Sequence, residues 1–141
     1  MDKNLKQQPN SIFKSIFIID PVKGERLQLA KLLKQEKFLM MTYTNLADCF
    51  KKTNPIKPDL AIYILRKDKN EPSQLKTIRK LFKKIHFIIL LTPDISELNI
   101  TEFRKHGFSS IHKAGNHDMV KELIYSLMPE CQATKAEEFL T

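Results

Sequence analysis

Residues 58–65 read PDLAIYIL, and this stretch decides the fold. After Asp59 every residue is apolar, with no alternation of polar and apolar positions, which is typical of a strand buried on both faces of a parallel sheet. We therefore predict a strand over residues 59–65. Similar runs over residues 15–20 (SIFIID) and 86–92 (HFIILLT) predict two more buried strands. A sheet built from such strands needs helices on both of its faces.

Segments with helical periodicity separate these runs. Residues 38–44 and 109–113 predict two further strands, and residues 23–36, 45–52, 95–106 and 117–128 predict helices. Another helix follows the polar loop 66–73, with an apolar stripe of Leu75, Ile78, Leu81, Phe82 and Ile85. Five strand and helix units in alternation predict an α/β fold, a doubly wound five-stranded parallel sheet with five helices in a flavodoxin-like, three-layer sandwich. Its site is expected at the carboxyl ends of the strands.

The length of 141 residues and the hydrophobic content of 42% fit one domain. We place this domain at residues 14–129. Residues 1–13 are polar and lack periodicity, so we predict a flexible lead-in, and residues 130–141 are expected to form a tail. Gly107 is expected to close the helix over residues 95–106 at its C-terminal end.

The cysteine and hydropathy patterns favour a cytoplasmic location. Cys49 and Cys131 are far apart and form no C-x-x-C motif, which argues against a disulfide framework. The first residues contain no apolar signal-peptide core, and the longest apolar run (FIILL, 87–91) is too short to span a membrane. We expect no membrane association.

Several motifs carry a family resemblance. IFIID over residues 16–20 ends the first strand, PDL over 58–60 begins the third, and IILLT over 88–92 forms the fourth. Gly107 precedes the fifth strand, which ends in IHK over residues 111–113. Together these residues resemble the receiver domain of bacterial two-component response regulators, over about residues 15–128.

The resemblance implies a phosphorylation pocket that is degenerate here. In the family, two acids after the first strand hold Mg²⁺, an aspartate ends the third strand and accepts the phosphoryl group, and a hydroxyl residue and a lysine sense it. The matching positions in this chain hold Asp20, Pro21, Ile64, Thr92 and Lys113. The family's aromatic switch position corresponds to Ile111.

These replacements remove the chemistry that the resemblance implies. Ile64 has no lone pair with which to attack a phosphoryl group. Mg²⁺ needs oxygen ligands, and Pro21 supplies no side-chain oxygen, so Asp20 is left nearly alone. Asp59 lies at the other end of the third strand, about 16 Å from Ile64 at strand rise, and Asp68 lies in the following loop. We predict an atypical pseudo-receiver with no catalytic residue, metal or cofactor, and no enzymatic activity.

The remaining pocket residues admit two interpretations each. Asp20 and Lys113 are expected to form a structural ion pair, with a ligand site as the alternative. The segment between Gly107 and Lys113 is one residue shorter than in the family, so Ala114 is the alternative occupant of the lysine position. Thr92 is either a turn hydroxyl or a sensor.

A basic segment stands out in the third helix. KTIRKLFKK over residues 76–84 places five cations on one predicted outer face: Lys76, Arg79, Lys80, Lys83 and Lys84. The net charge of +8 is consistent with a polyanionic partner. A solvated helix face is the ordinary interpretation, and an acidic protein surface or nucleic acid is the alternative.

Other chemical motifs do not occur in the sequence. There is no glycine-rich phosphate loop, and the four histidines show no metal-binding spacing. We therefore predict a phosphorylation-independent signalling domain of receiver type, which acts through protein–protein interaction with another signalling protein or with a second copy. The expected contact face combines the fourth helix, fifth strand and fifth helix. The alternatives are a nucleic-acid or acidic-surface binding module that uses the basic third helix, and a divergent phospho-receiver with a displaced acceptor.

Overall fold

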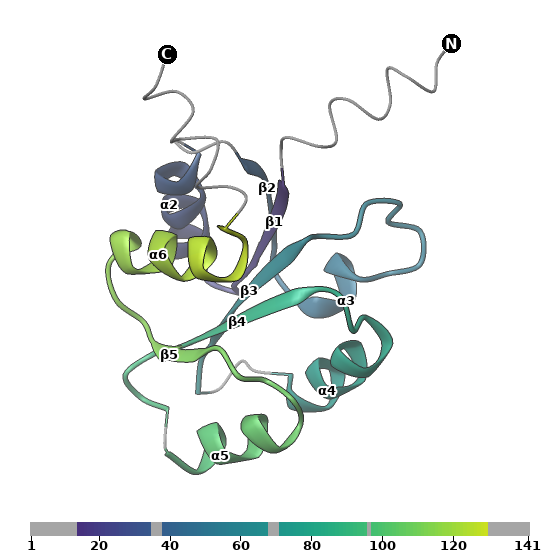
Figure 1. Cartoon of the computed structure of the whole chain (residues 1–141), viewed down its shortest axis with the longest axis vertical. Coiled ribbons are helices and arrows are strands. Elements are labelled where there is room, and N and C mark those ends of the chain that lie inside the picture. Colours follow the sequence, from purple (N-terminus) through teal and green to yellow (C-terminus); the bar gives the residue numbers. More distant parts are fainter. Residues whose placement is uncertain (1–13, 35–37, 68–70, 96, 130–141) are drawn as a thin grey trace.

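The computed structural model describes residues 14–34, 38–67, 71–95 and 97–129 (Figure 1). The predicted lead-in 1–13 and tail 130–141 lie outside these residues. The sheet strands are β1 (Lys14–Ile19), β2 (Phe38–Tyr43), β3 (Leu60–Leu65), β4 (His86–Leu91) and β5 (Ile111–Lys113). The helices are α2 (Lys23–Leu33), α3 (Leu46–Cys49), α4 (Pro72–Leu81), α5 (Glu97–Lys105) and α6 (His117–Leu127).

The sheet has the order β2-β1-β3-β4-β5, and all its pairings are parallel. All six residues of the central strand β3 are buried, as the uninterrupted apolar run in the sequence predicts. Ile62 lies in register between Ile18 of β1 and Ile88 of β4, and all three are completely buried. The predicted five-stranded parallel α/β sheet is confirmed.

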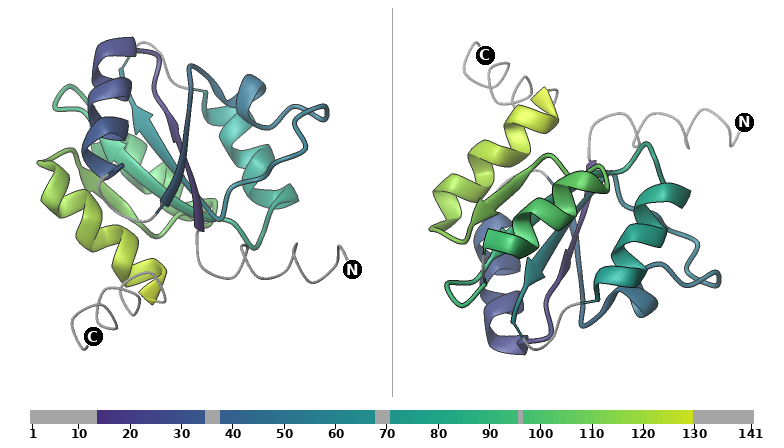
Figure 2. Two further views of the ribbon diagram at one scale, coloured as in Figure 1. Left: turned by 90° about the horizontal axis from the view of Figure 1, so that it is seen from above. Right: turned by 90° about the horizontal axis from the view of Figure 1, so that it is seen from below.

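Helices cover both faces of the sheet (Figure 2). Ala30 and Leu33 of α2 and Val120 and Ile124 of α6 pack in one core with Ile62. The opposite core contains side chains from the other three helices: Leu46 and Cys49 from α3, Leu75 and Ile78 from α4, and Phe103 from α5. The fold is therefore the predicted three-layer sandwich. No helix among the described residues is long and apolar enough to cross a membrane.

The predicted apolar stripe of the third helix is wrong at Leu81. The helix α4 ends there, and Phe82 leaves the helical conformation with φ −118° and ψ 75°. Leu75, Ile78 and Phe82 follow one another at spacings of three and four residues, so Phe82 takes the core-facing position of the last turn. Leu81 therefore points outward and is 70% exposed.

A glycine in the left-handed region ends α5, as predicted. Gly107 has φ +94°, and its N–H donates to the carbonyl of Arg104 at 3.2 Å. The N–H of Phe108 donates to the carbonyl of Phe103 at 3.2 Å, which completes a Schellman motif. The rings of Phe103 and Phe108 then meet edge to face at 5.9 Å. This cap joins α5 to β5.

The variant Gly107→Ala should lower the free energy of unfolding by about 1 kcal/mol, because a Cβ atom disfavours the left-handed conformation. Gly24→Ala is the matched control, since Gly24 lies in α2 and a Cβ atom added there would meet no other atom within 4 Å. That substitution should leave stability unchanged or raise it by about 0.5 kcal/mol. Urea unfolding of both variants measures the difference, and equal stabilities would contradict the role given to the cap.

Candidate functional site

A pocket of about 760 Å³ opens at the carboxyl ends of the strands, between α2 and α6. Its floor is apolar and contains Leu29 and Leu32 of α2, Ile64 of β3, Leu90 of β4 and Val120 of α6. Its polar wall contains Asp20, Arg66, Thr92 and Asp94. The pocket therefore lies where sequence reasoning placed the degenerate phosphorylation site.

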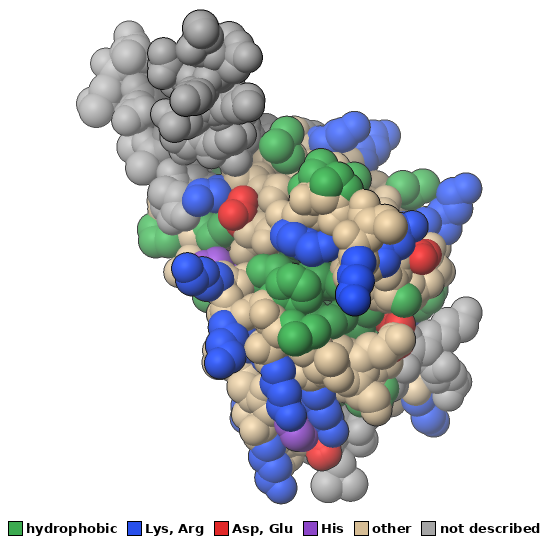
Figure 3. All heavy atoms as spheres, turned by 90° about the vertical axis from the view of Figure 1, so that its right-hand side faces the viewer, with side chains coloured by type: hydrophobic (Ala, Val, Ile, Leu, Met, Phe, Trp, Pro, Cys, Tyr) green, Lys and Arg blue, Asp and Glu red, His purple; other side chains and the backbone are tan. Residues whose placement is uncertain are grey.

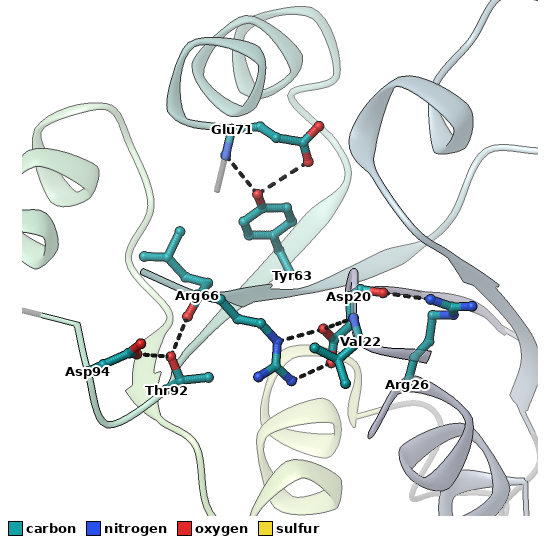
Figure 4. A network of polar contacts seen from close by, with 9 residues as sticks. Asp20, Val22, Arg26, Tyr63, Arg66, Glu71, Thr92 and Asp94 are labelled. Atoms are coloured by element: carbon teal, nitrogen blue, oxygen red, sulfur yellow. Dashed lines mark hydrogen bonds and ion pairs between the residues drawn. The ribbon is translucent and has the colours of Figure 1, made fainter. Parts of the chain in front are cut away.

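Asp20 is the charged residue at the centre of this site, and only 2% of it is exposed. Its carboxylate accepts two hydrogen bonds from the guanidinium of Arg66, from Nε to Oδ1 at 2.8 Å and from Nη2 to Oδ2 at 2.9 Å (Figure 4). The backbone N–H of Val22 also donates to Oδ1, at 2.9 Å. Paired contacts of this kind are among the strongest hydrogen bonds between side chains.

The backbone of Asp20 is also held on both sides. Its N–H donates to the carbonyl of Tyr43 at 3.0 Å, and its carbonyl accepts from Nη1 of Arg26 at 2.7 Å. Arg26 lies in the first turns of α2, so this contact ties the start of the helix to the end of β1 (Figure 4). Asp20 thus connects β1, β2, α2 and the segment after β3.

Arg66 remains a cation in this setting. The hydrogen bonds that Arg66 donates to Asp20 raise the pKa of its guanidinium above the ordinary value, and the charges of Glu25 and Asp94 raise it further, although burial opposes them. The Arg66 side chain is 22% exposed, whereas that of Asp20 is 3% exposed. Water therefore reaches the arginine more easily than the carboxylate.

The predicted ion pair between Asp20 and Lys113 is wrong. Lys113 ends β5 with an exposed side chain and makes no ion pair within the described part of the chain. Ala114, the next residue, lines the pocket instead. Asp20 directly follows β1 and Arg66 directly follows β3. Because β1 and β3 are adjacent strands, Arg66 and not Lys113 lies beside Asp20.

Ile64 adds hydrocarbon to the pocket at the position where the resemblance implies an aspartate. It is 7% exposed and packs in the core between the sheet and the layer of α2 and α6. Asp59 does not replace it, because its carboxylate accepts from the N–H of Ser15 at 2.9 Å, at the amino end of β3. Asp68 lies outside the described residues.

These residues do not fit a magnesium ion. Both oxygens of Asp20 bind Arg66, and Pro21 has no side-chain ligand. Within the ranges that the structure describes, no group of three or more His, Cys, Asp or Glu residues is placed to hold a metal. Mg²⁺ prefers six oxygen ligands in near-octahedral geometry, which this set cannot supply.

Thr92 makes a turn at the end of β4. Its hydroxyl lies 3.1 Å from the Leu65 carbonyl oxygen and also within hydrogen-bond distance of the Asp94 carboxylate. The carbonyl of Thr92 accepts from the N–H of Ile95 at 3.1 Å. The Thr92 hydroxyl thus has partners both at the end of β3 and in its own loop.

Sequence reasoning missed a second polar contact, on the opposite face of the sheet. The hydroxyl of Tyr63 accepts from the N–H of Glu71 at 2.9 Å and lies 3.3 Å from its carboxylate (Figure 4). The same carboxylate accepts from the N–H of Leu46, the first residue of α3, at 3.1 Å. Burial raises the pKa of Tyr63, so its hydroxyl stays protonated. A tyrosine inside an aliphatic strand was the available signal, because a buried hydroxyl needs a partner.

The five cations predicted on the outer face of the third helix do not form one free surface. Arg79 donates from Nε to the Gly107 carbonyl and from Nη1 to the Ile85 carbonyl, both at 3.3 Å. Lys76 lies 3.8 Å from the carboxylate of Glu102 on α5. Lys83 and Lys84 follow the end of α4, because the helix stops at Leu81.

The implied switch residue Ile111 and the cysteine Cys49 are both buried. Ile111, at the implied switch position, is 7% exposed and packs in the core beneath α4 and α5. Cys49 is completely buried, and burial raises the pKa of its thiol to about 12. Neither residue supplies a nucleophile or a hydrogen-bonding switch at neutral pH.

Comparison with solved structures identifies the fold. No family model matches the sequence, and no curated protein sequence matches it significantly. A response regulator from Thermotoga maritima superposes with a TM-score of 0.70 at 16% identity, over 83% of this chain and 98% of that one. A two-component response regulator from Clostridium difficile gives 0.68 at 18% identity, over 82% and 96%.

A third solved structure contains a phosphorylated aspartic acid. It is a response regulator protein from Burkholderia pseudomallei with a phosphorylated aspartic acid, a calcium ion and citrate. It superposes with a TM-score of 0.66 at 19% identity, over 90% of this chain and 74% of that one. This chain has the receiver-domain fold.

Asp20 is less exposed than its ion-pair partner Arg66, so we expect substitutions at the two residues to change stability by different amounts. Arg66→Leu should lower the free energy of unfolding by about 3 kcal/mol, because it leaves a buried carboxylate uncompensated. Asp20→Asn should lower the free energy of unfolding by only about 1 kcal/mol. The asparagine amide oxygen still accepts from the N–H of Val22, and the Arg66 side chain can move into solvent.

The double variant Asp20→Asn/Arg66→Leu should be more stable than Arg66→Leu alone, because no buried charge is left. Urea titrations of the wild type, the two single variants and the double variant at one pH complete this double-mutant cycle. Additive losses in the double variant would mean that Arg66 and Asp20 do not stabilise each other.

Proposed function

We propose that this chain is a receiver-like signalling domain that works by protein–protein contact and not by phosphorylation of an aspartate. The observation that carries the proposal is the bidentate pair between Asp20 and Arg66 beside Ile64. The buried carboxylate of Asp20 is already neutralised by the chain's own cation. We therefore propose no enzymatic activity for this chain.

Phosphotransfer to a receiver requires a nucleophilic carboxylate and a divalent cation that neutralises the approaching phosphoryl oxygens. Ile64 offers no oxygen, and Asp20 cannot bind a metal without releasing Arg66. A metal ion can dissociate, whereas a guanidinium is covalently part of the chain. The counter-charge of Asp20 therefore cannot dissociate from the chain, which supports a domain with one persistent state.

A domain without a phosphoryl switch responds only to partners that bind its states unequally. Ile111 is buried and apolar, so it cannot make the hydrogen-bonded switch of an aromatic hydroxyl. We infer that the concentration and affinity of the partner set the output. The proposed contact face is α5, β5 and α6, where Arg104, Lys105 and Lys113 are exposed.

Nucleic-acid binding by α4 is the second proposal, and the contacts of the basic segment weaken it. Arg79 is used inside the fold and Lys76 lies beside Glu102, which leaves Lys80, Lys83 and Lys84 for a phosphate backbone. Retention on nucleic acid that falls steeply with salt would support this alternative.

The phosphorylation proposal has a direct test. After incubation with acetyl phosphate and Mg²⁺, the intact mass of the protein should be unchanged, because Ile64 stands at the acceptor position and both carboxylate oxygens of Asp20 are bound by Arg66. A receiver domain with an acceptor aspartate, treated in the same tube, provides the positive control. A gain of one phosphoryl group in this chain, mapped to any aspartate, would support the displaced-acceptor alternative instead.

The contact-face proposal is tested with the full chain as bait in lysate of its native host. The double variant Arg104→Glu/Lys113→Glu should recover about tenfold less of a specific partner than the wild type, because two exposed cations of the face are reversed. Lys31→Glu/Lys34→Glu reverses two exposed cations at α2 and is the matched control. Equal losses in both variants would indicate a general charge effect and contradict the assigned face.

A further inference from the structure

The strand β2 forms an open edge of the sheet. Among the described residues it pairs with β1 alone. Its sequence, FLMMTY, contains no charged residue and no proline. Proteins usually protect an edge strand with lysine, proline or a bulge, because unpaired backbone groups invite another strand. None of these devices is present within β2.

The alternating direction of backbone groups along β2 shows which N–H and C=O groups face away from β1. The carbonyl of Tyr43 accepts from the N–H of Asp20, so Tyr43 directs its backbone groups toward β1. Successive residues of a strand alternate in the direction of these groups. Met40 and Thr42 therefore direct their N–H and C=O groups toward the outer edge, where a further strand could pair.

Apolar side chains are exposed beside this edge. Leu39 is 58% exposed and Met41 is 39% exposed, and α3, the helix that follows β2, is a single turn of four residues. Ile56, which is 49% exposed, lies in the loop after α3. We name Leu39, Met41 and Ile56 the edge patch.

Polar contacts connect the parts of the edge patch. The hydroxyl of Tyr43 lies 3.9 Å from the sulfur of Met41 and accepts from the side-chain amide of Asn54 at 3.1 Å. The amide oxygen of Asn54 accepts from the N–H of Ile56 at 3.3 Å. The loop after α3 is therefore held against the end of β2.

This loop is basic. Lys51 and Lys52 are exposed, and Lys57 donates to the carbonyls of Lys51 and Asn54 and lies 5.9 Å from the ring centroid of Phe82. On the side of the molecule that carries α3, this loop and α4, hydrophobic side chains lie exposed among many Lys and Arg side chains and few acidic ones (Figure 3). An acidic partner complements such a surface.

We propose that the edge of β2 binds an extended, acidic segment of a partner protein, which adds to the sheet as a further strand. Its backbone would pair with Met40 and Thr42, alternate apolar side chains would cover Leu39 and Met41, and its carboxylates would face Lys51 and Lys52. A second copy of the chain fits less well, because each copy brings the same basic loop and a net charge of +8. This surface differs from the α5, β5 and α6 face and does not depend on it.

A short synthetic peptide of alternating glutamate and valine, with capped ends, is the probe. Added to the ¹⁵N-labelled full chain, it should shift the amide resonances of residues 38–43 and 51–57. Leu39→Glu and Lys51→Glu/Lys52→Glu should each weaken its binding by about tenfold, because each change places a carboxylate against the peptide. The same peptide with N-methyl groups on alternate amides should not bind, because it cannot complete the ladder.

Leu81→Glu is the matched control, since it makes the same change at an exposed leucine on α4, outside the edge patch. It should leave the affinity unchanged, and the amide spectrum of each variant reports whether it is folded. Several results would overturn the proposal. One is an equal loss of peptide affinity in Leu81→Glu, and another is equally tight binding of a peptide of alternating lysine and valine. The others are a self-association of the chain that Leu39→Glu abolishes, and contacts between β2 and residues 130–141 in the free protein.

Discussion

A carboxylate buried at the carboxyl end of β1 must be neutralised, and this constraint organises the carboxyl edge of the sheet. Asp20 is 2% exposed, and its side chain and backbone bind Arg66, Val22, Arg26 and Tyr43. The contacts connect β1, β2, α2 and the segment after β3. Loss of the arginine would leave a charge that water cannot reach, which is more costly than the loss of an exposed ion pair.

The same pair determines which chemistry the pocket can support. Its floor is hydrocarbon from both helices of one layer and from Ile64, and its buried carboxylate is held by two hydrogen bonds from one guanidinium. At this site Ile64 offers no oxygen, and both oxygens of Asp20 are bound by Arg66. The chain has the receiver-domain fold, and the charge of Asp20 is balanced by Arg66 within the chain, which is the physical basis for proposing a contact domain.

The parallel topology separates the surfaces that remain for partners. The pocket lies at the carboxyl ends of the strands, the face of α5, β5 and α6 lies beyond one edge of the sheet, and β2 forms the other edge. The short helix α3 leaves β2 less covered than the strands beneath α4 and α5. The two proposed contact surfaces therefore lie at opposite edges of the sheet and do not overlap.

The sequence by itself determined the strand order along the chain, the burial of β3, the cap at Gly107 and the absence of an acceptor carboxylate at position 64, because hydrophobic periodicity and residue chemistry are local properties. It also identified the acid at the end of β1. Only the tertiary structure decided that Arg66 and not Lys113 neutralises Asp20, that Arg79 turns inward, and that Leu81 is exposed. Asp20 and Arg66 are 46 residues apart in the chain, and their contact depends on the adjacency of β1 and β3, which no local pattern encodes.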